Sequence, residues 1–187
     1  MLTHLKKGFT IVELLIVVVV IAILASITIV SYGGITEQAK MSSLSSTVNQ
    51  YMKLLEMYHV ENGTFPPGDW ACLGQSVSDY PAKDGYAAGA CVKGTHNGGF
   101  VYPGFSSTVS TALAPYASNL PSPLYDEAPN EFGNTMRGLL YDQHSAHAST
   151  ATITYYLSGN KSCPIGTKVY FNSTYSSTRC NYVLTKD

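Results

Sequence analysis

The chain has 187 residues, a formal net charge of −1 and four cysteines, all of them beyond residue 70. This length leaves room for an N-terminal segment and one domain of about 120 residues. The nearly neutral charge argues against a nucleic-acid-binding surface, which requires a strongly basic patch. The four cysteines, the 14 tyrosines that all follow Val30 and the many Ser, Thr and Gly residues favour an exported, β-rich domain with disulfides.

An apolar run of 22 residues occupies positions 9–30 and follows a short basic segment. Glu13 is the only residue in this run whose side chain can carry a charge. As a helix that rises about 1.5 Å per residue, the run would extend roughly 33 Å, enough to cross a bilayer core of about 30 Å. Lys6 and Lys7 precede the run, and no lysine or arginine follows before Lys40. The positive-inside rule therefore predicts a cytoplasmic N-terminus and export of the remaining chain.

An ordinary secretory signal is an alternative for this segment, because it too combines positive charge with an apolar core. Its cleavage site would follow the apolar core at small residues. Val20-Ile21-Ala22 and Ile23-Leu24-Ala25 match that pattern weakly, and the apolar run continues past both. Neither a signal peptide nor a plain signal anchor explains the carboxylate of Glu13.

The start of the run resembles a known export signal. Lys7-Gly8-Phe9-Thr10-Ile11-Val12-Glu13-Leu14 resembles the class III signal of type IV pilins and the related pseudopilins. The resemblance implies that a membrane-embedded prepilin peptidase cuts between Gly8 and Phe9. Residues 1–8 would be the leader that is removed, with Lys6 and Lys7 as its charges. The same enzyme would then methylate the new amino terminus of Phe9.

Glu13 is expected to act in assembly. A lone carboxylate in an apolar segment tends to become protonated or to find a cation. Cleavage after Gly8 would create an α-ammonium on Phe9, and a neighbouring subunit shifted along the axis would bring its ammonium to Glu13. Each buried charge would neutralise the other, so the correct stagger is favoured. The alternative is a carboxylate that snorkels to the nearby membrane interface.

A long helix is predicted from about Phe9 to about Asn62, because no proline occurs before Pro66. Residues 9–30 would form its transmembrane or filament-core part, and residues 31–62 an amphipathic part packed on the head domain. Five apolar residues of the second part share one face of the helix. These residues are Leu44, Val48, Tyr51, Leu55 and Tyr58. The alternative for this stripe is a site for a partner helix.

Glycines mark two further positions along the predicted helix. Gly33-Gly34 lies just past the apolar run and is either a hinge or a pair that a continuous helix tolerates. Gly63 is suited to terminate the helix, and Pro66-Pro67 prevents its continuation. The stretch from Tyr58 to Pro66 also resembles the helix exit of many bacterial pilins.

The remaining sequence predicts an α+β fold in which the long helix packs on a C-terminal antiparallel sheet, as in type IV pilins. Residues 63–130 are interrupted by glycine, proline and serine and form an irregular region, with one expected helix over Ser107–Ala117. Residues 131–187 are expected to form the sheet with a C-terminal disulfide loop. Its predicted strands are Thr135–Gln143, Ala151–Ser158, Thr167–Asn172 and Thr178–Thr185.

The four cysteines allow three pairings, which the sequence alone does not distinguish. We prefer Cys72 with Cys91 and Cys163 with Cys180, because both pairs are local in sequence. The second pair also resembles the C-terminal disulfide loop of type IV pilins.

No catalytic constellation, metal site or cofactor motif stands out in the sequence. Asp142-Gln143-His144-Ser145-Ala146-His147 combines acid, histidine and serine, but the members of a triad normally converge from separate segments. As a metal site this stretch would offer Asp142, His144 and His147, and an exposed loop is the simpler interpretation. The sequons at Asn62 and Asn172 are interpreted as incidental in a bacterial-type export system.

The sequence thus predicts a structural pilin subunit, not an enzyme, that polymerises through its N-terminal helix into an extracellular type IV pilus. The resemblance implies four partners: other pilin subunits, the prepilin peptidase and methylase, an inner-membrane assembly platform, and the cytoplasmic membrane before assembly. Adhesion, twitching motility and DNA uptake are functions of this family. The alternatives are a minor pilin, a type II secretion pseudopilin, or a membrane-anchored extracellular enzyme or binding module.

Overall fold

A computed structural model describes residues 8–93, 104–122, 127–130, 132–143 and 149–186. The chain forms two compact units, Met1–Met41 and Ser42–Asp187. Lys6 and Lys7 lie outside the described residues, as do residues 144–148 of the predicted exposed loop.

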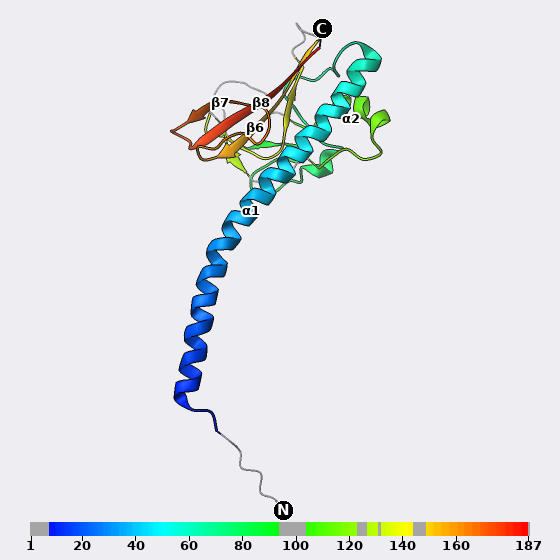
Figure 1. Cartoon of the computed structure of the whole chain (residues 1–187). Coiled ribbons are helices and arrows are strands. Elements are labelled where there is room, and N and C mark those ends of the chain that lie inside the picture. The colour runs from blue at the N-terminus through cyan, green and yellow to red at the C-terminus, as the bar shows by residue number, and fades with distance from the viewer. Residues whose placement is uncertain (1–7, 94–103, 123–126, 131, 144–148, 187) are drawn as a thin grey trace, which may run out of the picture. The chain divides into compact units, whose positions relative to one another are not determined.

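Helix α1 covers Ile11–Asn62, a total of 52 residues (Figure 1). It stays helical through Gly33 and Gly34, so the structure corresponds to the tolerated-glycine alternative at this position. A glycine inside a helix costs about 1 kcal/mol relative to alanine, and this cost does not interrupt α1. Within the described residues, no helix has both the length and the apolar character that a membrane crossing requires.

The second half of α1 contributes its apolar stripe to the core of the head. Leu44, Val48, Tyr51 and Leu55 are buried, and Tyr58 is half-buried. The hydroxyl of Tyr51 donates a hydrogen bond to the backbone carbonyl of Pro121 at 2.7 Å. The stripe therefore packs within its own unit, which leaves no role for it as the partner-helix site considered from the sequence.

Helix α1 ends at Asn62 as the glycine signal predicts. Gly63 has a φ of +72°, and its N–H donates to the carbonyl of His59 at 2.8 Å. This bond closes the last turn with a residue in the left-handed region, which glycine adopts without strain. The His59 and Phe65 rings pack against each other across this turn, with their centroids 4.7 Å apart.

The main sheet has five antiparallel strands in the order β1-β5-β6-β8-β7. Figure 1 labels three of them, β6, β8 and β7. Their bounds are β1 Ala71–Cys72, β5 Leu140–Asp142, β6 Thr150–Ser158, β7 Thr167–Asn172 and β8 Ser177–Thr185. The central pair is β6 and β8, which stay in register from Thr150 opposite Thr185 to Ser158 opposite Ser177. Strands β6 and β8 each begin one residue before their predicted first residue and end where predicted, and β7 coincides with its prediction.

A second, smaller antiparallel sheet has the order β2-β4-β3. Its strands are β2 Val92–Lys93, β3 Ala128–Pro129 and β4 Thr135–Met136. The single strand predicted over Thr135–Gln143 is therefore wrong, because β4 belongs to the small sheet and β5 to the main one. Gly138 separates them with a φ of +99°, a backbone conformation that a continuous strand excludes.

Short strands also form within residues 63–130, the segment that the sequence predicts to be irregular. β1 comes from the irregular region and forms one edge of the main sheet, while β2 and β3 supply two strands of the small sheet. Two-residue strands carry too little periodicity to be recognised in a sequence. The predicted helix Ser107–Ala117 divides into the α-helix α2, Ser107–Leu113, and a 3-10 turn η2, Ala114–Tyr116. A further 3-10 turn, η1, covers Val77–Asp79.

Strand β6 is buried on both faces. Ile153, Tyr155 and Leu157 share one face as the alternation predicts, and all three are buried. On the opposite face, Tyr156 is also buried, because it packs in a cluster with Met136 of β4 and other residues near the small sheet. The small sheet thus covers a face that a simple alternating pattern would leave in solvent.

Candidate assembly site and disulfide-tied head

The expected cleavage site lies in non-helical backbone at the start of α1. Gly8, Phe9 and Thr10 have no regular secondary structure, and all three are exposed. The Phe9 side chain is 79% exposed, and no neighbouring atom would lie within 4 Å of a side chain at Gly8. A peptidase could therefore reach the bond between Gly8 and Phe9 without unwinding a helix.

Thr10 and Glu13 bind each other at the first turn of α1. The backbone N–H and the hydroxyl of Thr10 both donate to Oε2 of Glu13, at 2.8 and 2.7 Å. In return, the Glu13 N–H donates to the Thr10 hydroxyl at 3.2 Å. This reciprocal arrangement is a capping box, in which a Thr at the N-cap and a Glu at the third helical residue satisfy backbone donors of the first turn.

Glu13 is therefore not the lone carboxylate expected from the sequence, because Thr10 binds it. The signal was available, because Thr10-Ile11-Val12-Glu13 has the T-x-x-E spacing of a capping box directly before an apolar run. Glu13 therefore caps the start of its own helix, and it is also the residue expected to contact a neighbouring subunit.

The segment of α1 from Ile11 to Ile27 presents apolar side chains on all sides of the helix. Every residue from Ile11 to Ile27 is exposed, and the large apolar ones are 44–86% exposed. A helix that is apolar all round requires an apolar surrounding, supplied by lipid or by other protein chains. The carboxylate of Glu13 is the only charged group on this surface of residues 11–27.

Both disulfides of the head follow the local pairing that we preferred from the sequence. Cys72 is bonded to Cys91 with the Cα atoms 5.8 Å apart, and Cys163 is bonded to Cys180 at the same Cα separation. Both pairs join segments that pack against each other, as a disulfide requires. The pairing is thereby confirmed, and the two nonlocal pairings are not formed.

The Cys72–Cys91 bond lies in the core beneath the small sheet. Both cysteines are buried and pack with Tyr80, Met136 and Tyr156. Arg137 secures the enclosed loop, because its guanidinium donates to the carbonyls of Pro81 and Ala90 and lies 4.0 Å from the centroid of the Tyr86 ring. These contacts compensate the burial of a cation with hydrogen bonds and an aromatic face.

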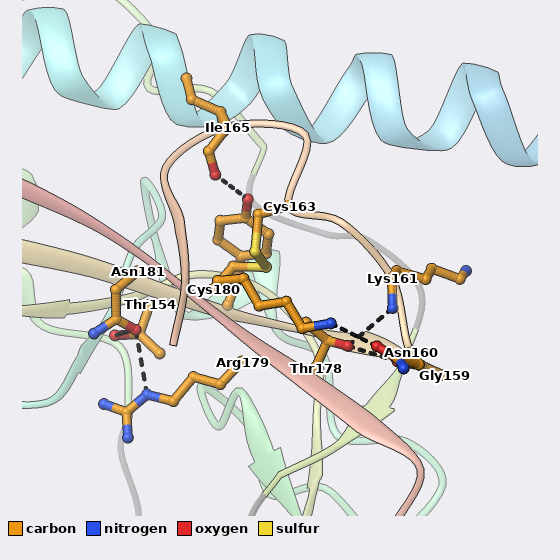
Figure 2. Close-up of a disulfide and its surroundings, with 12 residues drawn as sticks. Thr154, Gly159, Asn160, Lys161, Cys163, Ile165, Thr178, Arg179, Cys180 and Asn181 are labelled. Carbon is orange, nitrogen blue, oxygen red and sulfur yellow. Dashed lines mark hydrogen bonds between the residues drawn. A yellow bond between two sulfur atoms is a disulfide. The ribbon is translucent and has the colours of Figure 1, made fainter. Parts of the chain in front are cut away.

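The Cys163–Cys180 bond ties strand β8 to the loop between β6 and β7 (Figure 2). The loop is also attached by hydrogen bonds on both sides of the disulfide. The Lys161 N–H donates to the Thr178 hydroxyl at 3.0 Å, and this hydroxyl donates to the Gly159 carbonyl at 2.7 Å. The Ile165 carbonyl accepts a bond from the Tyr155 hydroxyl at 2.5 Å. The loop is therefore anchored to the sheet at several points.

Burial raises the pKa of several tyrosines of the head. It raises the pKa of Tyr155 to about 12. Burial also raises the pKa of Tyr51 and of Tyr141, with smaller contributions from the nearby negative charges of Asp79 and Asp142. These phenols stay neutral at physiological pH and act as hydrogen-bond donors in the core.

The candidate metal loop and the sequons contain no assembled site among the described residues. Asp142 ends β5, while His144 and His147 lie outside the described residues. In the part of the chain that the structure describes, no three His, Cys, Asp or Glu side chains are grouped to hold a metal. The amide of Asn62 donates to the Tyr58 carbonyl, and that of Asn172 accepts from the backbone of Thr174.

Comparisons with known proteins give the family. Residues 3–29 match the model of the prokaryotic N-terminal methylation motif. The chain is 30% identical over 102 residues to the major component of the type IV wide pilus of Thermus thermophilus, PilA4, a match that covers 51% of this chain and 78% of that protein. The chain belongs to the type IV pilin family.

Two neisserial proteins are also similar to this chain. It is 29% identical over 79 residues to the type IV major pilin protein PilE1 of Neisseria gonorrhoeae, covering 42% of this chain and 37% of that one. It is 28% identical over 79 residues to a fimbrial protein of Neisseria meningitidis, covering 42% of this chain and 46% of that one. The chain thus spans less than half the length of these two relatives. No solved structure matches the chain.

Family and fold together define a pilin subunit, whose role is structural. A type IV pilin polymerises with other pilins and is processed by a prepilin peptidase. The sequence-based expectations of family, fold and pilin function are confirmed.

Proposed function

We propose that this chain is cut between Gly8 and Phe9, methylated on Phe9 and held in the cytoplasmic membrane by residues 9–30 until an inner-membrane platform adds it to an extracellular pilus. Lys6 and Lys7 keep the leader on the cytoplasmic side, where the peptidase acts. The exposed, non-helical backbone at residues 8–10 supports the cleavage position. The apolar surface of residues 11–27 supports lipid as its surrounding before assembly and other pilin helices afterwards.

The contact that selects the subunit register is the pairing of Glu13 with the α-ammonium of Phe9 from a neighbouring chain. The observation that carries this step is a single carboxylate on an otherwise uncharged helical surface from Ile11 to Ile27. Such a charge is costly among apolar helices unless a cation meets it. Cleavage supplies that cation four residues away in sequence, at the same end of every subunit.

The test uses a host with a type IV pilus assembly system and no pilin of its own. Glu13→Val should leave leader removal and membrane association unchanged and should reduce pili in the sheared fraction at least tenfold, because the unpaired ammonium is then buried without a counter-charge. Leu14→Val is the matched control, since it alters a neighbouring exposed side chain and no charge. Sheared pili of Glu13→Val at the unaltered level would disprove the pairing.

Mass spectrometry of the sheared fraction tests the processing step separately. The subunit is expected at the mass of residues 9–187 with one added methyl group on Phe9. An unprocessed mass, or cleavage after Ala22 or Ala25, would contradict the proposed leader.

The same fraction distinguishes a major subunit from a minor pilin and an anchored module. We propose a major subunit, because PilA4 and PilE1 are both named as major pilus components. A dominant band at the processed mass is expected in sheared pili. A trace amount would indicate a minor pilin, and retention of the chain in the membrane with no filament would favour the anchored module.

A further inference from the structure

We propose that Asn62 is a latent deamidation site, which the cap of α1 and the side chain of Tyr116 keep unreactive in the folded head. Asn62 is followed by Gly63. An asparagine side chain reacts most readily with the next backbone nitrogen when that residue is glycine, because glycine has no side chain to hinder the approach. Both residues are exposed, so the water that completes the reaction has access to them.

The reaction needs only water and the chain itself. The Gly63 nitrogen attacks Cγ of Asn62, so that a new N–Cγ bond forms and the Cγ–Nδ2 bond breaks. The proton of the attacking nitrogen goes to the departing Nδ2 group, which leaves as ammonia, and the product is a cyclic succinimide. Water then opens this ring at either carbonyl, which leaves aspartate or isoaspartate. No oxidant or reductant takes part.

The attacking nitrogen is held by the cap of the helix. The Gly63 N–H donates to the His59 carbonyl at 2.8 Å, and Gly63 has the left-handed conformation that ends α1. Attack requires this hydrogen bond to break, because the nitrogen must lose its proton and turn toward Cγ. Opening of a hydrogen-bonded helix end is a local unfolding event, so only the small opened population reacts.

The carboxamide of Asn62 is held as well, and it is turned back along the helix. Its Nδ2 donates to the Tyr58 carbonyl at 2.9 Å, one turn earlier in α1, and to the Tyr116 hydroxyl at 3.3 Å. Side chains of a helix lean toward its N-terminus, whereas the Gly63 nitrogen follows Asn62 on the C-terminal side. Both reacting groups are thus engaged in hydrogen bonds that the reaction has to break.

Tyr116 is the tertiary part of this protection. Its hydroxyl donates to Oε2 of Glu61 at 2.6 Å and is therefore oriented to accept from the Asn62 amide. Its ring packs edge-on against the Tyr58 ring, with the centroids 6.2 Å apart. Tyr116 belongs to η2 and is separated from Asn62 by 54 positions in the chain. The protection therefore depends on the folded head as well as on the helix.

Deamidation would weaken the structure that prevents it. Aspartate and isoaspartate have no side-chain N–H to donate to the Tyr58 carbonyl or the Tyr116 hydroxyl. The new carboxylate would also lie beside Glu61 at the end of α1, where the helix dipole disfavours negative charge. Because the change is irreversible, the modified form accumulates with the age of the subunit.

The test measures the modification in the purified full-length chain in detergent, aged at mildly alkaline pH either folded or in denaturant. Peptide mapping by mass spectrometry detects aspartate and isoaspartate at position 62 by the mass gained when an NH group is replaced by oxygen. The folded chain should react at least about tenfold more slowly than the denatured chain, as expected when the reaction waits for local opening. Equal rates in the two states would overturn the proposal.

Tyr116→Phe tests the tertiary contact, because it removes the acceptor of Nδ2 and retains the ring. The folded variant should react about fivefold faster, the effect expected for one hydrogen bond, and the rate in denaturant should be unchanged. Tyr155→Phe is the matched control, since it removes a hydroxyl that bonds elsewhere in the head and leaves the contacts of Asn62 in place. An unchanged folded rate in Tyr116→Phe, or an equal acceleration in both variants, would overturn the role of Tyr116.

A second pair of variants tests the consequence of the modification. Asn62→Asp and Asn62→Val both remove the amide donor and have similar helix propensities, but only the first adds a charge. Asn62→Asp should shift the unfolding equilibrium about two- to fivefold further toward the unfolded state, the range expected for a charge at a helix end. Chemical denaturation measures the shift, and an Asn62→Asp variant at least as stable as Asn62→Val would overturn the predicted weakening.

Discussion

The Tyr155 hydroxyl donates a hydrogen bond to the Ile165 carbonyl and so attaches the loop between β6 and β7 to the face of the sheet on which Cys180 also lies. Tyr155 is buried in the centre of the sheet, directly opposite Cys180 of β8. The loop is thus held by a covalent bond and by a hydrogen bond that start from neighbouring positions on one face. This relationship predicts how the head responds when either bond is removed.

Tyr155→Phe should destabilise the head by about 1–2 kcal/mol, because the Ile165 carbonyl loses its donor while the ring still fills its place in the core. Chemical denaturation of the full-length chain in detergent, followed by tyrosine and tryptophan fluorescence, would measure the change. Tyr175→Phe is a suitable control, since Tyr175 is 41% exposed. A Tyr155→Phe variant as stable as the unaltered chain would mean that the bond contributes nothing to the head.

Removing the Cys163–Cys180 disulfide with a double Cys→Ser change should cost about 3 kcal/mol in the chain-entropy account, given a sequence separation of 17 residues. The Cys72–Cys91 pair has a similar separation of 19 residues. Its removal should cost more, because both cysteines are buried and serines would place two hydroxyls in an apolar cluster. Thermal unfolding of the two double variants compares them directly, and equal costs would contradict the role of burial.

The buried tyrosines predict a loss of stability at alkaline pH. The pKa of Tyr155 is raised by burial to about 12 in the folded head, against about 10 for an exposed phenol. Between these values the unfolded chain has lost the proton that the folded chain keeps, so unfolding becomes more favourable as pH rises. The contribution is complete below about pH 10 and disappears as pH increases through about 12.

Denaturation midpoints measured from pH 8 to 12 would test this window. In Tyr155→Phe the decline above about pH 10 should be shallower, because one of the raised phenol pKa values is absent. Tyr51 and Tyr141 should maintain part of the decline, since burial raises the pKa of each as well. Constant stability across the window would show that these phenols ionise as easily in the folded head as in the unfolded chain.

Gly138→Ala should destabilise the head by more than Gly159→Ala. Both glycines have positive φ, +99° and +84°, so alanine strains the backbone at each, at a cost of order 1–3 kcal/mol. A Cβ at Gly138 would also lie 2.7 Å from the hydroxyl oxygen of Tyr80, whereas one at Gly159 would meet nothing within 4 Å. The difference in unfolding free energy between the two variants therefore isolates the steric contact with Tyr80.

The features of this protein that depend on residues close together in the chain could be predicted from the sequence. The basic residues before the apolar run, the run itself with Glu13 and the glycine stop at Gly63 are each recognisable from residues within a few positions of one another. The long strands β6, β7 and β8 were predictable for the same reason. The preference for local cysteine pairs is also confirmed, although the sequence alone allowed three pairings. Even the capping box of Thr10 and Glu13 is encoded within four residues, so it was available to sequence reasoning and was overlooked.

Tertiary structure decided the features that depend on distant residues. Thr135–Gln143 has the composition of one strand, yet the close approach of Tyr80 to Gly138 accompanies its division between two sheets. β1 and β2 are only two residues long and exist because β5 and β4 supply their hydrogen bonds. Burial of Tyr156 likewise depends on the small sheet that covers it. The sequence by itself therefore determined the N-terminal methylation motif, the helix and its end, since these need only neighbouring residues. The strand partners and the burial of β6 on both faces were decided by contacts that only the folded head brings together.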